Sequence, residues 1–188
     1  MSSVETDQLA EYRSGSTEPA TADVLAALVK ALRPSILIET GTFEAKTTTK
    51  LLDAMFSYGH EKRSHLISLE YDRDRAQKAC ETIENTPMPI FADPSPITWE
   101  VACGDALQFL RNFEGSPDFV FLDDDHTATH VHQELTACFR IMRPGGVICM
   151  HDVIGPFGLD RVCREFGGVV LPFKRLHVAG GLGVICKP

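Results

Sequence analysis

The sequence predicts an α/β fold in which a mostly parallel sheet of seven strands is covered by helices on both faces. Two patterns predict it. Short apolar runs alternate with segments of helical periodicity five times, and the last two apolar runs then follow each other with no helix between them. The alternation is typical of parallel strands joined by crossover helices, and the closing pair indicates a hairpin whose last strand runs antiparallel.

The first half of the chain is expected to form a tail, then helices and strands in alternation. Residues 1–20 are polar and predict a flexible tail, so the domain is expected over residues 21–188. A leading helix is predicted from Thr21 to Leu32, because its apolar residues recur at helical spacing before Pro34. The elements expected next are a strand over 35–39, a helix after Gly41, a strand over 65–70, a helix over 73–83, a proline-rich loop over 85–95 and a strand over 97–103.

The second half continues the alternation. Its expected elements are a helix over 106–110, a strand over 119–122, a helix with Val131, Leu135, Cys138, Phe139 and Met142 on one face, a strand over 147–150, a helix over 159–166, and strands over 169–173 and 182–185 with a turn at Gly180-Gly181. Asp124 or Asp125 is expected to cap the helix that follows. Together the elements predict a Rossmann-like, doubly wound sheet, in which ligands bind beyond the carboxyl ends of the strands.

Composition excludes some classes of partner. The formal net charge is −8, whereas nucleic acids and anionic membrane surfaces are bound through an excess of Lys and Arg. No run approaches the roughly 18–20 apolar residues that span a bilayer. The six cysteines are widely spaced, with no CxxC pair and no secretory signal. We therefore expect a cytoplasmic protein with reduced thiols that acts on a small molecule.

Polar residues follow each predicted strand. Gly41, after the first, permits a tight turn and a close approach of the backbone to a ligand. Glu70 ends the second, where an acidic side chain suits hydrogen bonds to the ribose hydroxyls of a nucleotide. Asp105, after the third, either accepts a hydrogen bond from an adenine amino group or caps the next helix. The fourth and fifth strands are followed by Asp123-Asp124-Asp125-His126 and by His151-Asp152.

Five of these segments, in order and at compatible spacing, resemble the class I S-adenosylmethionine-dependent methyltransferases. The segments are IETGTFEAKTT, LISLEYD, VACGDALQFL, FVFLDDDH and RPGGVICMHDV, and the closing hairpin is a sixth agreement. The resemblance extends from about Thr21 to Lys187 and is closest to a small bacterial group with ETGTF, GDA, D-x-D-H, PGG and HDV motifs. It implies a transferase that uses S-adenosylmethionine as its methyl donor.

The resemblance also implies a set of cofactor-binding residues at the strand ends. Its members are Glu39, Gly41, Thr42 and Phe43 along the methionine part, Glu70 at the ribose, Asp105 and Ala106 at the adenine, and Asp123 beside the sulfonium. One position departs from the pattern, since Ala45 stands where the family often has glycine. The extra methyl group leaves less room for a close backbone approach, so this loop is expected to lie slightly differently.

A narrower resemblance links the chain to catechol-type O-methyltransferases, which hold a divalent metal at the ends of their fourth and fifth strands. Asp123, His151 and Asp152 stand at the corresponding positions. Oxygen ligands suit magnesium, whereas a histidine shifts the preference towards manganese, iron or zinc, or leaves no metal site. His126 stands where those enzymes place a catalytic lysine and is a candidate general base. The alternatives are a packed His151, a capping Asp152 and a solvated His126.

Methyl transfer to a small-molecule acceptor, most simply a hydroxyl, is the function these residues favour. The length leaves no room for a separate substrate domain, so the acceptor site is expected to be open or completed by a second subunit of a homodimer. The alternative is a methyltransferase-fold sensor or partner subunit. A P-loop phosphotransferase is disfavoured because only three residues separate Gly41 from Ala45, and a nicotinamide dehydrogenase because G-x-G-x-x-G is absent.

Overall fold

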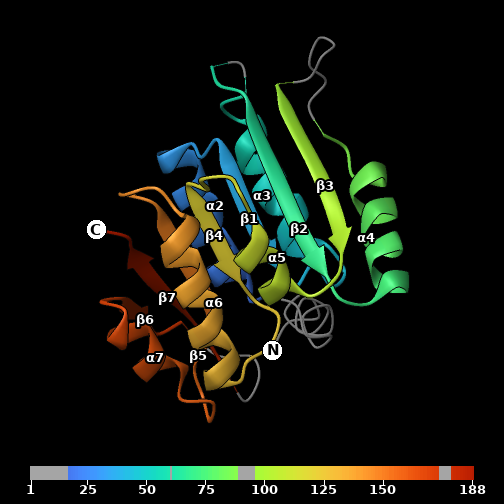
Figure 1. The fold of residues 1–188 in the computed structure, drawn as a ribbon. Coiled ribbons are helices and arrows are strands. Elements are labelled where there is room, and N and C mark those ends of the chain that lie inside the picture. The colour runs from blue at the N-terminus through green and yellow to red at the C-terminus, as the bar shows by residue number, and fades with distance from the viewer. Residues whose placement is uncertain (1–16, 60, 89–95, 174–178) are drawn as a thin grey trace, which may run out of the picture.

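The computed structural model describes residues 17–59, 61–88, 96–173 and 179–188. Its centre is a seven-stranded sheet with the order β3-β2-β1-β4-β5-β7-β6 (Figure 1). The strands are β1 (Ile36–Thr40), β2 (Ser64–Glu70), β3 (Ile97–Cys103), β4 (Phe119–Leu122), β5 (Val147–Ile154), β6 (Val169–Leu171) and β7 (Gly180–Cys186). The predicted Rossmann-like, doubly wound fold class is confirmed.

Helices cover both faces of the sheet, with one apolar core on each side. The helices are α2 (Pro19–Leu32), α3 (Lys46–Phe56), α4 (Arg73–Asn85), α5 (Ala106–Asn112), α6 (Ala128–Ile141) and α7 (Leu159–Glu165). Buried residues of α2, α3 and α4 share one core, and those of α5, α6 and α7 share the other. None of the helices in the described part of the chain is long and apolar enough to cross a membrane.

Strands β1 to β5 pair in parallel, so their carboxyl ends meet at one edge of the sheet. Strand β7 pairs antiparallel with both β5 and β6, which confirms the predicted closing hairpin. The strand order changes direction beside β1: strands β2 and β3 lie on one side of β1, and β4 and β5 lie on its other side. In open sheets of this kind, the crevice at such a reversal is where ligands bind.

Side-chain caps fix the start of three helices beside that edge. Asp72 accepts a hydrogen bond from a backbone N–H in the first turn of α4, and Asp105 does the same for α5. Thr127 caps α6. The expected cap at Asp124 or Asp125 is therefore wrong, although Asp125 accepts a hydrogen bond from the Thr127 N–H at 2.7 Å.

Most elements begin and end within two residues of their predicted bounds, and several boundaries differ. Helix α2 begins at Pro19, inside the expected tail, and Thr17 and Glu18 are buried; residues 1–16 lie outside the described part. Strand β5 runs on past residue 150, because its pairing with β7 continues to Ile154 through an irregularity of register. Gly180-Gly181 begins β7 and is not a turn, since residue 180 pairs with Ile154.

Candidate functional site

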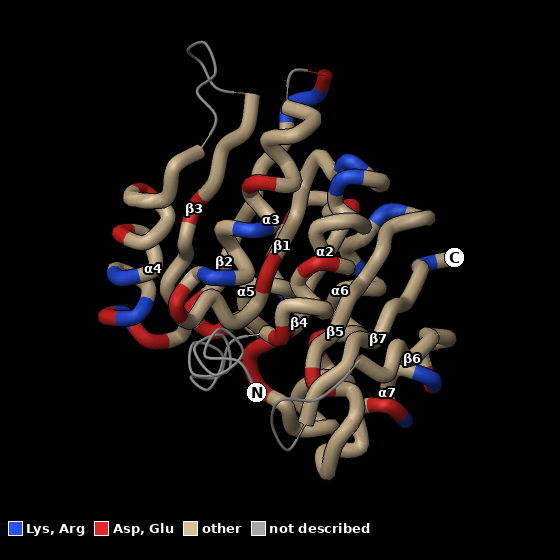
Figure 2. Tube along the Cα trace, turned by 180° about the vertical axis from the view of Figure 1, so that it is seen from behind, with Lys and Arg blue, Asp and Glu red and all other residues tan. Residues whose placement is uncertain are grey.

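A cavity of about 540 Å³ opens at the carboxyl ends of β1 to β4. Many of the predicted site residues line it, namely Gly41, Phe43, Glu70, Asp105, Ala106, Asp123 and His126. Tyr71, Arg75 and the Asp124–Asp125 pair complete part of the same wall. Figure 2 shows how acidic positions gather along this edge of the sheet. The volume lies in the range of roughly 300–1,000 Å³ that is usual for small-molecule sites.

Gly41 holds the loop after β1 directly against the end of β4. Its φ is +82°, and a Cβ atom at this position would lie 2.2 Å from the Asp123 carbonyl oxygen. Only glycine tolerates both the left-handed backbone and that contact. Ala45, a few residues further on, also has a left-handed φ of +59° and stands at the N-cap position of α3, without a side-chain hydrogen bond. The family's preference for glycine at this position therefore has a backbone reason, and the alanine carries the strain instead.

Glu70 closes the far side of the same loop. One carboxylate oxygen accepts a hydrogen bond from the Phe43 N–H at 2.9 Å, and the other accepts from the Asp72 N–H at 3.0 Å. Phe43 in turn lies under the Arg75 guanidinium, 5.4 Å from the ring centroid. The carboxylate thus joins the loops after β1 and β2, and it lines the cavity with lone pairs still free for a ligand.

Asp105 caps helix α5 and also lines the cavity. Its carboxylate accepts a hydrogen bond from the Gln108 N–H at 2.8 Å and so caps α5. It also lines the cavity beside Ala106. The capping explanation is confirmed, while the adenine contact stays a prediction.

Glu39 and Thr42 lie beneath the cavity wall. The fully buried Glu39 carboxylate accepts hydrogen bonds from Ser68 and Thr48, both at 2.6 Å, while its other oxygen has no hydrogen-bond partner in the described chain. Burial raises the pKa of Glu39 to about 7, against the lowering effect of these two hydrogen bonds. The hydroxyl groups of Thr42 and Ser68 form a hydrogen bond of 2.6 Å. Thr42 also lines a smaller hollow, together with Thr17 and Asp123.

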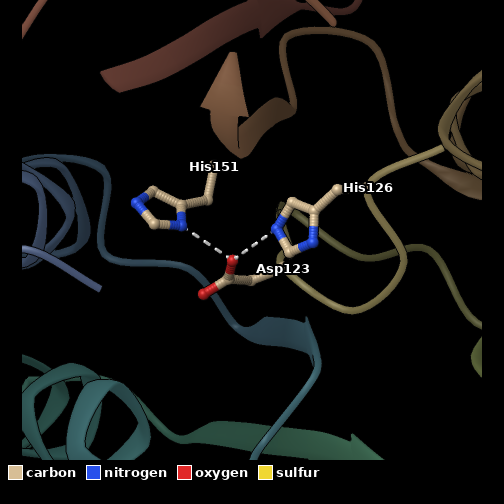
Figure 3. A group of neighbouring side chains, drawn as sticks. All are labelled: Asp123, His126 and His151. Carbon is tan, nitrogen blue, oxygen red and sulfur yellow. Dashed lines mark hydrogen bonds and ion pairs between the residues drawn. The ribbon is translucent and has the colours of Figure 1, made fainter. Parts of the chain in front are cut away.

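Asp123 is the centre of a group of ionisable side chains next to the cavity (Figure 3). One carboxylate oxygen lies 2.9 Å from His151 Nδ1 and 3.3 Å from His126 Nε2, and the other accepts a hydrogen bond from Thr17 at 2.9 Å. Burial alone would raise the pKa of Asp123, but the charge of His151 and the bonds from both imidazoles outweigh it and lower the pKa to about 2. Asp123 is therefore ionised throughout the physiological range.

His151 lies between two carboxylates. Its Nδ1 faces Asp123 and its Nε2 lies 2.6 Å from the carboxylate of Glu18. Burial disfavours the charged ring, but Asp123 and Glu18 prevail and raise the pKa of His151 well above its ordinary value. Thr17 and Glu18 were not predicted as site residues, because they fall in the expected tail. Pro19, at the first position of α2, was the available signal that the helix starts there.

His126 and Asp152 complete this group. His126 Nε2 lies 3.3 Å from Asp152 as well as from Asp123. Burial lowers the pKa of His126, but the Asp123 hydrogen bond and the two nearby carboxylates raise it overall. Asp152 has a left-handed φ of +54° at the irregularity in β5. Burial raises the pKa of Asp152 against the opposite effect of the two imidazoles. We call Glu18, Asp123, His126, His151 and Asp152 the Asp123 cluster.

The predicted metal trio of Asp123, His151 and Asp152 does not form a ready set of ligands. The groups whose ligand atoms lie within 4.8 Å of one another are Asp123–His126–His151 and Glu18–His151–Asp152. Both ring nitrogens of His151 face carboxylates at hydrogen-bond distance. A metal ligand needs a free lone pair on the ring, whereas a ring held in this way is an imidazolium. Metal binding at the trio stays a prediction.

The fold and the position of the site define the class of the protein. A parallel sheet that ends in an antiparallel hairpin strand between β5 and β6, with a glycine loop after β1 and acids after β2 and β4, is the class I S-adenosylmethionine-dependent methyltransferase fold. A family model described as a methyltransferase domain matches residues 38–153. The chain belongs to this methyltransferase family. No match was found among curated proteins.

Solved structures of methyltransferases share the fold. An O-methyltransferase of Bacillus cereus, in complex with S-adenosylhomocysteine, is 19% identical with a TM-score of 0.73, covering 98% of this chain and 88% of that one. The O-methyltransferase TomG of Streptomyces achromogenes, in complex with S-adenosylmethionine, is 16% identical with a TM-score of 0.71, covering 96% and 86%. The N-methyltransferase NodS of Bradyrhizobium japonicum is 18% identical with a TM-score of 0.62, covering 90% and 95%.

Proposed function

We propose that the protein transfers the methyl group of S-adenosylmethionine to a hydroxyl of a small molecule, with His126 as the general base. The observation that carries the proposal is the His126–Asp123 pair, which lines the same cavity as Gly41 and Glu70. A hydroxyl is a weak nucleophile at neutral pH, so a base beside the donor matters for oxygen more than for a free amine. A paired imidazole at this position favours an oxygen acceptor.

The residues present suit the donor. S-adenosylmethionine carries a positive sulfonium and an ammonium group, and it supplies a methyl carbon that is electrophilic. Asp123 is ionised beside the cavity, and Glu39 presents a buried oxygen without a hydrogen-bond partner in the described chain, under the glycine loop. Glu70 lines the cavity with a carboxylate suited to ribose hydroxyls. We propose the predicted cofactor contacts of Thr42, Phe43, Asp105 and Ala106 on the same grounds.

The acid–base step follows from the neighbours of His126. In its neutral form the imidazole accepts the proton of the acceptor hydroxyl while the oxygen attacks the methyl carbon. The C–O bond forms as the S–C bond breaks, the bonding pair returns to sulfur, and the proton remains on His126. Asp123 and Asp152, each 3.3 Å away, stabilise the resulting imidazolium. General bases of this kind contribute about 10²–10⁴-fold to the rate.

The pH dependence has a defined sign. The two carboxylates raise the pKa of His126 above its ordinary value despite burial. Because the base acts in its neutral form, turnover should rise with pH through that raised value. The variant H126Q should bind S-adenosylmethionine as the wild type does in calorimetry, lose about 10²-fold or more in turnover and lose this rise.

Measured outcomes separate this function from its rivals. We would titrate the chain with S-adenosylmethionine and S-adenosylhomocysteine, then screen hydroxyl and amine acceptors by mass spectrometry. H132Q, on the outer side of α6, is the matched control for H126Q. Binding of ATP or NAD without binding of S-adenosylmethionine would contradict the proposal. Cofactor binding without transfer to any acceptor would favour a sensor or partner subunit instead.

A metal-assisted reaction is the second form of this proposal. A divalent ion at Asp123 and Asp152 would lower the pKa of the acceptor hydroxyl. The arrangement of His151 between two carboxylates favours the metal-free form, so no step is assigned to an ion. Full turnover after treatment with EDTA is the expected result. Loss of turnover that Mg²⁺ or Mn²⁺ restores would establish the metal-assisted form.

The cellular location, the partners and the oligomeric state of the protein are also part of the proposal. All six cysteines are free, which agrees with a reduced, cytoplasmic setting. The net charge of −8 disfavours nucleic acid as a partner. A homodimer that completes the acceptor side of the cavity is checked by sedimentation equilibrium, with and without the cofactor.

A further inference from the structure

A second group of ionisable side chains lies between the end of β4 and the first turns of α6. Asp124 directly follows Asp123, and its carboxylate lies 3.3 Å from His130 on α6. His130 and Glu134 stand four residues apart on α6 and therefore on one face of the helix. We call Asp124, His130 and Glu134 the Asp124 cluster. It is not needed for the methyl transfer proposed above.

The ligand atoms of the Asp124 cluster converge. His130 Nε2 lies 3.3 Å from an Asp124 carboxylate oxygen and 3.8 Å from a Glu134 carboxylate oxygen. One atom from each residue lies within 4.8 Å of the other two. Ligands around one ion at about 2.0–2.2 Å are separated by distances of this size. The Thr40 hydroxyl donates to the second Asp124 oxygen at 3.3 Å and helps to orient that carboxylate.

Glu134 is the decisive residue. Its side chain is 0% exposed, yet neither carboxylate oxygen has a hydrogen-bond partner among the described residues. His130 Nε2 is buried and also lacks such a partner in that part of the chain. Buried polar atoms in native proteins are nearly always satisfied by protein, water or an ion. A fully buried carboxylate without a hydrogen-bond partner, beside an imidazole and a second carboxylate, indicates a missing ligand.

We propose that Asp124, His130 and Glu134 bind a divalent first-row transition ion, with zinc as the best fit. One imidazole nitrogen and two carboxylates form a set that zinc accepts, and their two negative charges balance the ion. The main cavity, which Asp124 and His130 line, offers a route of entry and a place for a water ligand. The proposed methyl transfer does not need this ion or a hydroxide bound to it. We assign the ion a structural role, in which it links the end of β4 to α6.

The proposal differs from the predicted metal trio in its chemistry. In the Asp123 cluster both ring nitrogens of His151 lie within 2.9 Å of carboxylate oxygens, whereas His130 Nε2 is no nearer than 3.3 Å to one and the Glu134 oxygens have no hydrogen-bond partner among the described residues. The rival explanation is a protonated Glu134 that shares its proton with Asp124. Burial, followed by the Asp124 charge, raises the pKa of Glu134 well above its usual range, which such a protonated state would require.

The test uses Co²⁺ as a spectroscopic substitute for zinc, and then Zn²⁺ itself. Full-length protein is freed of metal with a chelator, titrated with Co²⁺ by visible absorption and calorimetry, and the bound metal is counted by mass spectrometry. E134Q and H130Q should each bind one ion per chain fewer than the wild type. H132Q, on the same helix but outside the cluster, should bind as many as the wild type.

The outcomes decide the proposal in either direction. A wild type that binds no Co²⁺, or E134Q and H130Q variants that bind as much as the wild type, would overturn it. Circular dichroism melts check that each variant folds. If E134Q does not fold, anomalous diffraction from a crystal soaked in Co²⁺ gives the answer. A peak between Asp124, His130 and Glu134 supports the site, and peaks confined to the Asp123 cluster, or no peak, refute it.

Discussion

Two consecutive aspartates at the end of β4 serve two different clusters of acids and histidines. In the Asp123 cluster, the imidazole of His151 is held between the Asp123 and Glu18 carboxylates. In the Asp124 cluster, the Glu134 carboxylate is fully buried beside the partly exposed His130, and neither of its oxygens has a hydrogen-bond partner within the described chain. Residue composition is similar, but the central imidazole of the Asp123 cluster has a carboxylate at each ring nitrogen, whereas neither oxygen of the buried Glu134 has a hydrogen-bond partner in the described chain.

The difference shows that ionisable residues in a group do not by themselves indicate a metal. A satisfied cluster holds fixed charges and can move a proton, because its ion pairs stabilise an imidazolium. An unsatisfied cluster retains free lone pairs, which is the condition for binding a cation. Sequence resemblance directed attention to a metal at Asp123, whereas the geometry favours Asp124.

A substitution at Gly41 should have the largest effect on stability, because this residue packs against the backbone of Asp123 and Asp124, one from each cluster. Replacing Gly41 by Ala puts a Cβ atom 2.2 Å from the Asp123 carbonyl oxygen and about 3.0 Å from the Asp124 Cα, at a φ of +82°. The free energy of unfolding, measured by urea titration, should fall by more than about 3 kcal/mol.

Gly145 provides the matched control, because its φ is +79° and a Cβ atom there would meet nothing within 4 Å. Gly145→Ala therefore carries the backbone cost alone, about 1–2 kcal/mol. Equal losses for the two variants would contradict the close contact between the β1 loop and β4.

The same substitution in each cluster should give opposite results. Glu18→Gln removes the charge that faces His151 and should lower the stability of the metal-free chain by about 1–3 kcal/mol. Glu134→Gln removes an unsatisfied buried carboxylate and should leave stability unchanged or raise it. Both values come from urea titrations at neutral pH. A larger loss for Glu134→Gln than for Glu18→Gln would reverse the comparison.

Acid should weaken the Asp123 cluster through its central carboxylate. The pKa of Asp123 in the folded chain is about 2, below its ordinary value of 3.8. Its contribution to stability is therefore present above pH 4 or so and is lost as the pH falls towards 2, in total about 2 kcal/mol. Thermal melts of wild type and Asp123→Asn between about pH 5 and 2 measure this term, and parallel curves for the two proteins would refute it.

The smallest effect is expected at Ala45, which lies away from both clusters. Ala45→Gly relieves a left-handed φ of +59° and should raise stability by up to about 1 kcal/mol, or leave it unchanged. Ala54→Gly, at a buried position inside α3, should instead lower it by about 1 kcal/mol or more. Chemical denaturation compares the two, and a destabilised Ala45→Gly would show that the loop carries no strain there.

Much of the fold follows from local pattern. Apolar runs such as 119–122 match β4 to the residue, because a strand buried on both faces must be apolar throughout. Gly41 was recognised because a tight loop between a strand and a helix requires glycine. The start of α2 was misplaced, since residues 17–18 are polar, and their buried partners include Asp123 just after β4 and His151 on β5, which are distant in the sequence.

The sequence by itself determined the order of the elements, the class of the fold and the acids that follow each strand, because periodicity and strand-end residues are local properties. Only the tertiary structure decided which of those acids are satisfied. Glu18 and His151 are 133 residues apart in the chain, and Asp123 and His151 are 28 apart. Hydrogen bonds between such distant groups depend on how the strands come together in the sheet, so only the tertiary structure shows that the Asp123 cluster holds fixed charges while the Glu134 carboxylate has no hydrogen-bond partner in the described chain.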